Sequence, residues 1–226
     1  DTGTEDSWTD LSHALEALGV THLTGVIVTH MDKDHYGGAK QLAESDTAID
    51  GWYASWAWEK EKWKKHPVVK AAAVRGEEIT LLKPGDTLSD GLLTVIGPIQ
   101  EREESENDNS LVLVASGGGG KMLLTGDMEY DEENDLLAAG VIPSCEVLKV
   151  GHHGRDDATS AALVAAVQPK VAVISTSSVI LPESPAKRVL RVLSSAGAQI
   201  VQTQQAEIGV RVTISGGNVT VEFLNN

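Results

Sequence analysis

The feature that most constrains this chain is a short apolar run followed at once by a dense group of metal-ligand side chains. Residues 26–28 read Val-Ile-Val, and the next ten residues contain His30, Asp32, Asp34 and His35 before Gly37-Gly38. Imidazoles and carboxylates are first-choice ligands for divalent metals. A strand that ends in a Gly-rich turn can direct several of them at one point. The segment therefore favours a metal-dependent hydrolase whose active site lies at a strand end.

Two later segments repeat this arrangement. The apolar run Met122–Thr125 leads to Gly126-Asp127, and Val147–Val150 leads to Gly151 followed by His152, His153 and Gly154. A single His or Asp after a strand is as often a hydrogen-bonded turn residue as a ligand. Three such strand ends, holding four of the seven histidines, argue against coincidence. The sequence therefore predicts a metal site where these strand ends meet.

The ordered motifs resemble those of the metallo-β-lactamase-like superfamily. They are His-x-Asp-x-Asp-His at 30–35, an Asn/Ser segment at 107–110, Leu-Leu-Thr-Gly-Asp at 123–127 and Leu-Lys-Val-x-His-His-Gly at 148–154. Within the superfamily the chain most resembles the C-terminal domain of ComEC-type DNA-uptake (competence) proteins and their free-standing relatives. The opening Asp1-Thr2-Gly3 resembles the Asp-x-Gly turn of that family. The resemblance implies an α/β (α+β) fold, a four-layer αββα sandwich over residues 1–226 as one domain. We expect its first strands to be lacking or truncated.

Apolar periodicity and capping residues predict the elements of such a fold. The expected helices are Ser7–Leu18, Gly38–Glu44, Ala57–Lys65, Glu129–Ala139, Ser160–Val167 and Pro185–Ser195. The last of these is predicted from Ser184-Pro185, a cap residue followed by proline at the first helical position. Gly117–Gly120 and Gly216-Gly217-Asn218 lie between apolar runs and predict hairpin turns.

The resemblance also implies a set of metal ligands. His30 and Asp32 would bind one metal ion, Asp34 and His35 a second, and Asp127 would bridge them. One or both of His152 and His153 would complete the first site, and we favour His152 because it is nearer the strand end. His153 would then support the ligands or contact substrate. Asp34, Asp127 and His153 would be the catalytic residues of a reaction that uses a metal-bridging hydroxide. We expect Zn²⁺ first and Mn²⁺ second, since Asp32 replaces the usual histidine and makes the ligand set harder.

Several residues are expected to contact substrate or to support the ligands. No histidine occurs between His66 and His152 to act as the intermediate ligand of the superfamily, and the corresponding region carries Asn107, Asn109 and Ser110. A simple polar turn before a strand explains these residues equally well. Arg155 replaces the serine usual after His-His-Gly and is a candidate phosphate contact. Lys149 is a further candidate because it lies in the strand that leads to the histidine pair.

The charge of the chain bears on its substrate. A formal net charge of −15 disfavours non-specific capture of nucleic acid, although two divalent cations would offset it locally. Four of the five tryptophans lie in the window 52–66, together with several lysines. Such residues stack on bases, or they form a helix whose Trp face packs on the core. We expect a nucleic acid or another phosphodiester as substrate, no membrane contact from this segment and no obligate protein partner.

Three functions are compatible with the sequence. The first is a metal-dependent phosphodiesterase or nuclease, as the resemblance implies. The second is a hydrolase of a carbonyl ester, lactone, thioester or β-lactam, and the third is a metal-binding module that docks a partner without turnover. No run has the length of a membrane span, no signal peptide opens the chain, and the lone Cys145 excludes an internal disulfide. An extracytoplasmic or secreted location follows from the resemblance only.

Overall fold

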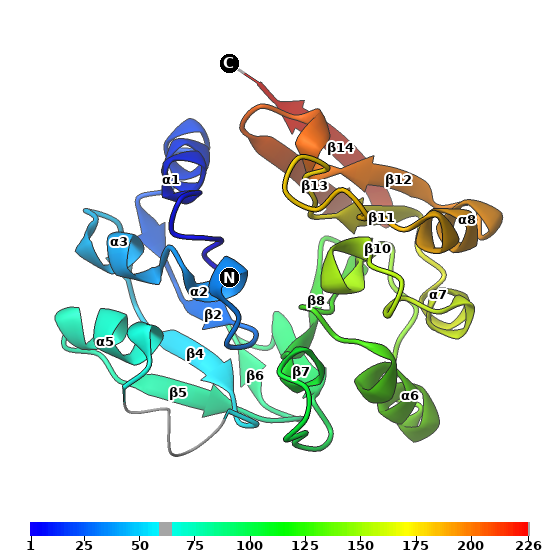
Figure 1. The fold of residues 1–226 in the computed structure, drawn as a ribbon. Coiled ribbons are helices and arrows are strands. Elements are labelled where there is room, and N and C mark those ends of the chain that lie inside the picture. The colour runs from blue at the N-terminus through cyan, green and yellow to red at the C-terminus, as the bar shows by residue number, and fades with distance from the viewer. Residues whose placement is uncertain (59–64, 226) are drawn as a thin grey trace.

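The computed structural model describes residues 1–58 and 65–225. Within that part of the chain, the elements form four layers in the order helix, sheet, sheet and helix, which run from left to right in Figure 1. The α/β (α+β) class and the αββα layering expected from the sequence are confirmed. The assignment of residues 1–226 to one domain stays a prediction.

The first half supplies one outer layer of helices and a small parallel sheet. Its elements are α1 (Trp8–Ala17), β1 (His22–Leu23), β2 (Val26–Val28), α2 (Lys33–Tyr36), α3 (Ala39–Glu44), β3 (Ala48–Ile49), β4 (Trp52–Ser55), α5 (Pro67–Val74) and β5 (Ile79–Leu82). Strands β2, β4 and β5 pair in parallel in that order, and β1 pairs with β3. Parallel neighbours need a crossover connection, and α3 provides it between β2 and β4.

The second half forms the larger sheet and the other helical layer. Its elements are β6 (Thr87–Leu88), β7 (Leu93–Gly97), η1 (Asn107–Asn109), β8 (Val112–Gly117), β9 (Gly120–Leu124), α6 (Tyr130–Ala139), β10 (Val147–Lys149), η2 (Gly151–Gly154), α7 (Ala161–Val167), β11 (Val171–Ile174), α8 (Lys187–Ser195), β12 (Gln199–Gln202), η3 (Thr203–Gln205), β13 (Gly209–Ser215) and β14 (Asn218–Leu224). Seven strands pair in the order β12-β11-β10-β9-β8-β7-β6. The pairings from β9 to β12 are parallel and those from β6 to β9 are antiparallel.

The two sheets face each other because their strands alternate buried side chains between two sides. On β2, Val26 and Val28 pack toward the outer helices, whereas Ile27 packs toward the larger sheet. There it meets a cluster that includes Leu111 and Leu113, which are 0% and 3% exposed. The β13–β14 hairpin packs through its valines against β10, β11 and β12. The strand ends that carry the ligand-type residues are thus held between two packed halves.

Most of the expected elements occur where the sequence predicts them. The main departures concern α5, which was not predicted, and α8, which begins at Lys187 rather than at Pro185. The Ser184–Pro185 peptide bond is cis, and this pair lies before the helix. The helix expected over Ala57–Lys65 falls largely on residues 59–64, outside the described part of the chain. Among the described residues, no helix has both the length and the apolar character needed to cross a bilayer.

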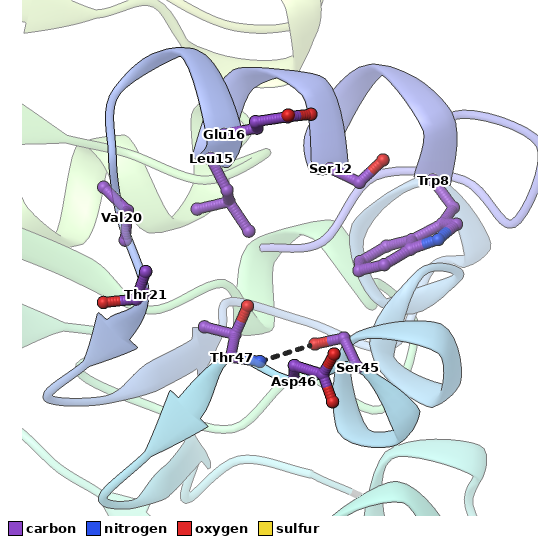
Figure 2. Close-up of a pocket in the computed structure, with 9 residues that line it drawn as sticks. All are labelled: Trp8, Ser12, Leu15, Glu16, Val20, Thr21, Ser45, Asp46 and Thr47. Atoms are coloured by element: carbon purple, nitrogen blue, oxygen red, sulfur yellow. Dashed lines mark hydrogen bonds between the residues drawn. The ribbon is translucent and has the colours of Figure 1, made fainter.

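A surface pocket of about 440 Å³ lies in the outer layer of the first half. As Figure 2 shows, Trp8 and Leu15 of α1 face Ser45 and Thr47 in the turn before β3. The Thr47 backbone N–H donates to Ser45 Oγ over 3.3 Å, which holds this turn in place. None of the residues that line the pocket is a predicted ligand, so the pocket is separate from the predicted metal site.

The buried carboxyl of Glu132 makes the stability of the fold depend on pH. Glu132 on α6 is fully buried, and its Oε1 accepts a hydrogen bond of 2.9 Å from the Ile99 backbone N–H. Burial raises the pKa of this carboxyl from 4.5 to about 8. Between these two values the unfolded chain loses the proton while the folded chain keeps it. The free energy of unfolding therefore falls as pH rises from about 4.5 to 8.

We predict that Glu132→Gln flattens this pH dependence and stabilises the protein at pH 8, by a few kcal/mol at most, since one pKa unit corresponds to about 1.4 kcal/mol. The glutamine keeps the acceptor for Ile99 and has no proton to lose. Urea unfolding between pH 5 and pH 9 measures the effect, with Asp131→Asn on the exposed side of α6 as the matched control. Parallel pH profiles for wild type and Glu132→Gln would contradict the assignment.

Candidate metal centre

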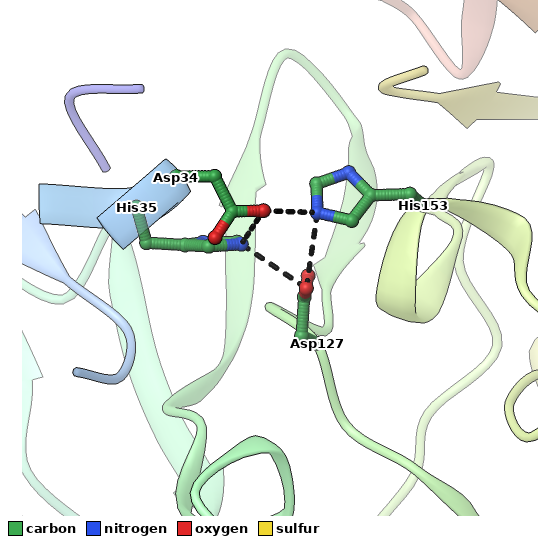
Figure 3. A group of neighbouring side chains, drawn as sticks. All are labelled: Asp34, His35, Asp127 and His153. Atoms are coloured by element: carbon green, nitrogen blue, oxygen red, sulfur yellow. Dashed lines mark hydrogen bonds and ion pairs between the residues drawn. The ribbon is translucent and has the colours of Figure 1, made fainter. Parts of the chain in front are cut away.

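The predicted ligands converge because three strands end at one place between the two sheets. β2 leads to His30 and then to α2, which carries Asp34 and His35. β9 leads to Asp127, and β10 leads to the η2 turn with the histidine pair. Figure 3 shows Asp34, His35, Asp127 and His153 pointing toward one another from these elements. Each of the four offers a ligand atom, and all these atoms lie within 4.8 Å of one another.

The Asp127 carboxylate is at the centre of this cluster and is only 3% exposed. Its Oδ2 lies 3.1 Å from His35 Nε2 and 3.1 Å from His153 Nε2. Its Oδ1 lies 3.4 Å from Lys149 Nζ, which also donates to the Gly126 carbonyl over 2.6 Å. Although burial alone would raise the pKa of the Asp127 carboxyl, Lys149 and the bonds to His153 and His35 hold it well below its usual range. The Asp127 side chain is therefore a carboxylate anion that contacts two imidazoles and an ammonium group.

Close backbone packing brings Asp127 to this position. Gly126 has a φ of 53°, and a Cβ there would lie 2.9 Å from Ser110 Cβ and 3.1 Å from Thr29 Cβ. Only glycine fits both the left-handed conformation and the space. The Asp127 backbone N–H donates to Ser110 Oγ over 3.0 Å. Ser110, a predicted supporting residue, thus orients the start of the turn that carries the central carboxylate.

His153 joins Asp127 to Asp34. Its Nδ1 donates to the Ser175 carbonyl over 2.8 Å, so Nε2 faces the cluster. Nε2 lies 3.1 Å from Asp34 Oδ2 and 3.1 Å from Asp127 Oδ2. Burial opposes a charge on His153, but the bonds to Asp127 and Asp34 outweigh it and raise its pKa to about 9. The hydrogen bond with His153 also lowers the pKa of Asp34 to about 2.

His35 is oriented by the first residue of the chain. Its Nδ1 lies 2.9 Å from Asp1 Oδ2, while Asp1 Oδ1 accepts a 2.7 Å hydrogen bond from the Thr29 backbone N–H. The Thr2 backbone N–H donates to the His35 carbonyl over 2.7 Å, and a Cβ on Gly38 would lie 2.5 Å from the Thr2 carbonyl oxygen. Glycine at 38 therefore lets the opening turn lie against α2. A carboxylate on Nδ1 leaves Nε2 free to bind a metal.

Asp1 is the functional residue that the sequence analysis missed. The Asp-x-Gly motif was noted as a turn, and the motif itself was the signal that a carboxylate occurs there. The contact with His35 joins positions 34 residues apart. No local pattern reports such a contact, so the role of Asp1 required the tertiary structure.

His30 and Asp32 lie at one side of the cluster. His30 is fully buried, its Nδ1 is 3.1 Å from Thr29 Oγ1, and its ring centroid is 4.1 Å from that of His35. Burial and the neighbouring His35 lower the pKa of His30 to about 3, so its ring is neutral. Its Nε2 lies 3.8 Å from Asp32 Oδ2, and burial together with Asp34 raises the pKa of Asp32. His30 and Asp32 are therefore adjacent, as the predicted pairing requires.

The two neighbouring histidines diverge. His152 and His153 have left-handed φ values of 42° and 54°, which cost energy for residues other than glycine and occur preferentially at functional sites. Their ring centroids lie 6.3 Å apart. The structure places His153 in the cluster and turns His152 toward Glu129 and Asp157, whereas the sequence analysis favoured His152. Periodicity does not reveal which side of a strained turn a ring faces, and the role of each ring stays a prediction.

The remaining predicted residues lie around the cluster. Asn107 Nδ2 donates to Glu129 Oε1 over 2.6 Å and lies 3.5 Å from His152 Nε2. Asn109 instead bonds the Arg102 backbone through both ends of its amide, at 2.8 Å each, and so closes a turn. Arg155 is 39% exposed and lies 3.8 Å from Glu183. Asn107 is thus beside the site, and Asn109 supports the loop.

The tryptophan window packs into the fold wherever the structure describes it. Trp52 and Trp58 are each 1% exposed, and Trp56 Nε1 donates to the Pro98 carbonyl over 3.0 Å. These contacts agree with the packing alternative rather than with base stacking. Lys60, Lys62 and Lys64 lie outside the described residues.

The donor set fits divalent metal ions. The Nε2 atom of His30 is buried and makes no hydrogen bond among the described residues, and buried polar atoms normally have a partner. Three separations in the cluster are 3.1 Å. Ligands about 2.1 Å from an ion and at right angles to each other are about 3.0 Å apart. The negative charge that favours a proton on His153 Nε2 equally favours a cation at that point.

We predict that Asp1→Ala weakens metal binding by about 10–100-fold, because the carboxylate that orients His35 is lost. Isothermal titration calorimetry of metal-stripped protein with Zn²⁺ or Mn²⁺ measures the affinity. Glu5→Ala, an exposed acid in the same opening segment, is the control. Equal affinities in wild type and Asp1→Ala would show that His35 needs no carboxylate partner.

Comparison with known proteins identifies the family to which this chain is similar. The family model of the metallo-beta-lactamase superfamily matches residues 1–178. The chain is 32% identical to ComE operon protein 3 of Bacillus subtilis (strain 168) over 197 residues, which are 84% of this chain and 25% of that protein. It is 27% identical to competence protein ComA of Neisseria gonorrhoeae over 206 residues, 90% of this chain and 27% of that protein. The chain thus spans about a quarter of the length of these curated relatives.

Solved structures show the same fold at low sequence identity. The metal-dependent hydrolase Tm1679 of the β-lactamase superfamily matches with a TM-score of 0.60 and 13% identity, over 95% of this chain and 88% of that one. The diiron β-hydroxylase CmlA of Streptomyces venezuelae matches with a TM-score of 0.55 and 10% identity, over 90% of this chain and 45% of that one. The family implies divalent metal ions, in agreement with the donor set described above. This chain belongs to the metallo-β-lactamase superfamily of metal-dependent hydrolases, with relatives among bacterial competence proteins.

Proposed function

We propose that this chain is a metal-dependent phosphodiesterase or nuclease of the ComEC type. The observation that carries the proposal is the convergence of Asp34, His35, Asp127 and His153, with His30 and Asp32 beside them. Two divalent cations at such a site would supply a hydroxide nucleophile and stabilise both oxygens of an in-line phosphoryl displacement. The resemblance to ComEC-type DNA-uptake proteins supports DNA as the substrate class, and the relatives include a competence protein and a recombination protein.

The residues of the chain prepare this site in three ways. Asp127 presents one oxygen to both imidazoles, because Lys149 holds the other. Ser175 and Asp1 fix the ring orientations of His153 and His35 through their Nδ1 atoms. Asp32 and Asp34 are about half exposed, so the cluster opens to solvent on their side and an extended substrate can reach it there.

The metal preference follows from the ligand types. Four carboxylate or imidazole groups meet in the main cluster, and Asp32 adds another carboxylate beside His30. Oxygen-rich sets of this kind suit Mn²⁺ better than histidine-rich sets do, although Zn²⁺ binds nitrogen ligands more strongly. We propose that the site works with Zn²⁺ and that Mn²⁺ competes effectively.

A carbonyl hydrolase is the second candidate. A metal-activated hydroxide attacks an ester, lactone or β-lactam carbonyl as readily as a phosphorus atom. The region of the intermediate superfamily histidine holds Asn107 instead, and Asn107 bonds to Glu129. This replacement favours the phosphodiester, since the carbonyl hydrolases of the superfamily usually keep the intermediate histidine.

We predict that metal-loaded protein cleaves single-stranded DNA and bis-p-nitrophenyl phosphate but leaves nitrocefin intact. Asp127→Ala should abolish cleavage, because it removes the carboxylate that joins the two ligand groups. Release of nitrophenolate and gel analysis of DNA measure the activity, and Asp50→Asn at the exposed His22 contact is the control. Turnover of nitrocefin alone would favour the carbonyl hydrolase, and an active Asp127→Ala would remove Asp127 from its proposed role.

We also predict that Mn²⁺ restores phosphodiesterase activity to metal-stripped protein, to within about tenfold of the activity with Zn²⁺, as expected for a ligand set with added carboxylate. Initial rates with bis-p-nitrophenyl phosphate at matched free metal concentrations provide the comparison. Activity with Zn²⁺ and none with Mn²⁺ would count against the oxygen-rich site.

A further inference from the structure

A second group of ligand-type side chains lies next to the metal cluster and has no part in it. It consists of Glu129, His152 and Asp157, whose ligand atoms all lie within 4.8 Å of one another. His152 Nδ1 is 2.9 Å from Asp157 Oδ1 and 3.2 Å from Glu129 Oε1. The side chain of His152 is 12% exposed, that of Glu129 is 26% exposed and that of Asp157 is 44% exposed. The group is thus partly sheltered but open to ions from solvent.

The His152 imidazole is shared between the two carboxylates. His152 Nδ1 carries at most one hydrogen, and two carboxylate oxygens lie within 3.2 Å of it. Asn107 Nδ2 also approaches Glu129 Oε1, at 2.6 Å, while the Asn107 amide oxygen is buried and accepts no hydrogen bond from the described residues. Two carboxylates and an imidazole gathered at one point are donors that a divalent cation prefers.

The backbone directs these donors away from the main cluster. The left-handed conformations of His152 and His153 turn the two rings apart, so that His153 faces Asp127 and His152 faces Glu129. Asp108, just after Asn107, accepts the backbone N–H groups of Glu129 and Glu132 at 2.9 and 3.2 Å. This carboxylate joins η1 to the start of α6, so Asn107 and Glu129 are held side by side. Glu129 before α6 and the segment that carries His152 and Asp157 are therefore held around one point.

The geometry points to a further divalent-cation site, which we assign to Glu129, His152 and Asp157. The separations of 2.9 and 3.2 Å resemble those in the main cluster. They suit an ion with ligands about 2.1 Å away at right angles, the octahedral geometry typical of Mn²⁺ and Mg²⁺. The imidazole nitrogen favours Mn²⁺ over Mg²⁺, so Mn²⁺ is the appropriate probe.

A cation here would change the charge around the main cluster. The chain carries a net charge of −15, and this already includes the carboxylates of Glu129 and Asp157 next to the main cluster. A bound divalent cation cancels both charges. This consequence rests on the proposed phosphodiesterase function, whereas the site itself does not depend on which substrate is cleaved.

Counting bound ions tests the site. The metal-stripped 226-residue chain is titrated with Mn²⁺. Electron paramagnetic resonance measures the free Mn²⁺, and the bound Mn²⁺ is the difference from the total added. Elemental analysis after dialysis provides an independent count of bound ions. We expect wild type to bind one equivalent more than Asp157→Asn or Glu129→Gln, with the tighter ions of the main cluster retained. Asp156→Asn is the matched control, because this adjacent carboxylate contacts Arg188 at 2.8 Å and should leave the count unchanged.

Two further measurements make the outcome decisive. Circular dichroism verifies that each variant is folded. If Glu129→Gln does not fold, the comparison of wild type with Asp157→Asn is sufficient for the test. Anomalous diffraction at the manganese edge should show a peak between Glu129, His152 and Asp157. Equal counts in wild type and Asp157→Asn, an equal loss in Asp156→Asn, or anomalous peaks at the main cluster only would each overturn the site. Absence of DNA cleavage together with the extra equivalent would overturn the proposed function and leave the site intact.

Discussion

The contact of the Asp127 carboxylate with His35 and His153 is the interaction on which the rest of the site depends. Asp127 follows β9 of the larger sheet, whereas His35 belongs to α2 beside the smaller one. One oxygen lies 3.1 Å from both imidazoles, so the ligand cluster exists only when the two halves are packed together. The apolar cluster around Leu111 and Leu113 supplies that packing. Metal binding and folding are therefore expected to stabilise each other.

Most of the surrounding residues orient the imidazole rings and the carboxylate of the cluster. Asp1 and Ser175 fix the two imidazoles through Nδ1, and Lys149 fixes one oxygen of Asp127. Such contacts orient ligands and tune the metal that they hold. The turn at His152 and His153 extends this logic, because its left-handed residues separate two neighbouring rings into two groups of donors. The two groups of ligand-type side chains thus lie next to each other at neighbouring strand ends.

Most helices and strands were predictable from sequence, because alternation and helical periodicity record which faces are buried, whereas the four-layer arrangement followed from the family resemblance. β2 illustrates this, since Ile27 faces the opposite sheet and its two neighbours face the helices. Predictions were poorer where local signals were ambiguous. Pro185 was taken as the first residue of a helix, but the Ser184–Pro185 bond is cis and the helix begins at Lys187. Helix α5 begins at Pro67 and is capped by His66, which accepts from the Val68 backbone N–H, a signal that the periodicity analysis overlooked.

The sequence by itself determined the kinds of ligand and the three strand ends that carry them. The motif at 30–35, Asp127 and the histidine pair were all recognisable, because metal chemistry needs these residue types at close spacing. Only the tertiary structure decided that His153 rather than His152 faces Asp127, that Asp1 supports His35, and that His152 joins Glu129 and Asp157. Sequence spacing carries no information about the direction of a ring on a left-handed turn or about contacts between distant segments. Those directions follow from how the two sheets pack and where each strand ends.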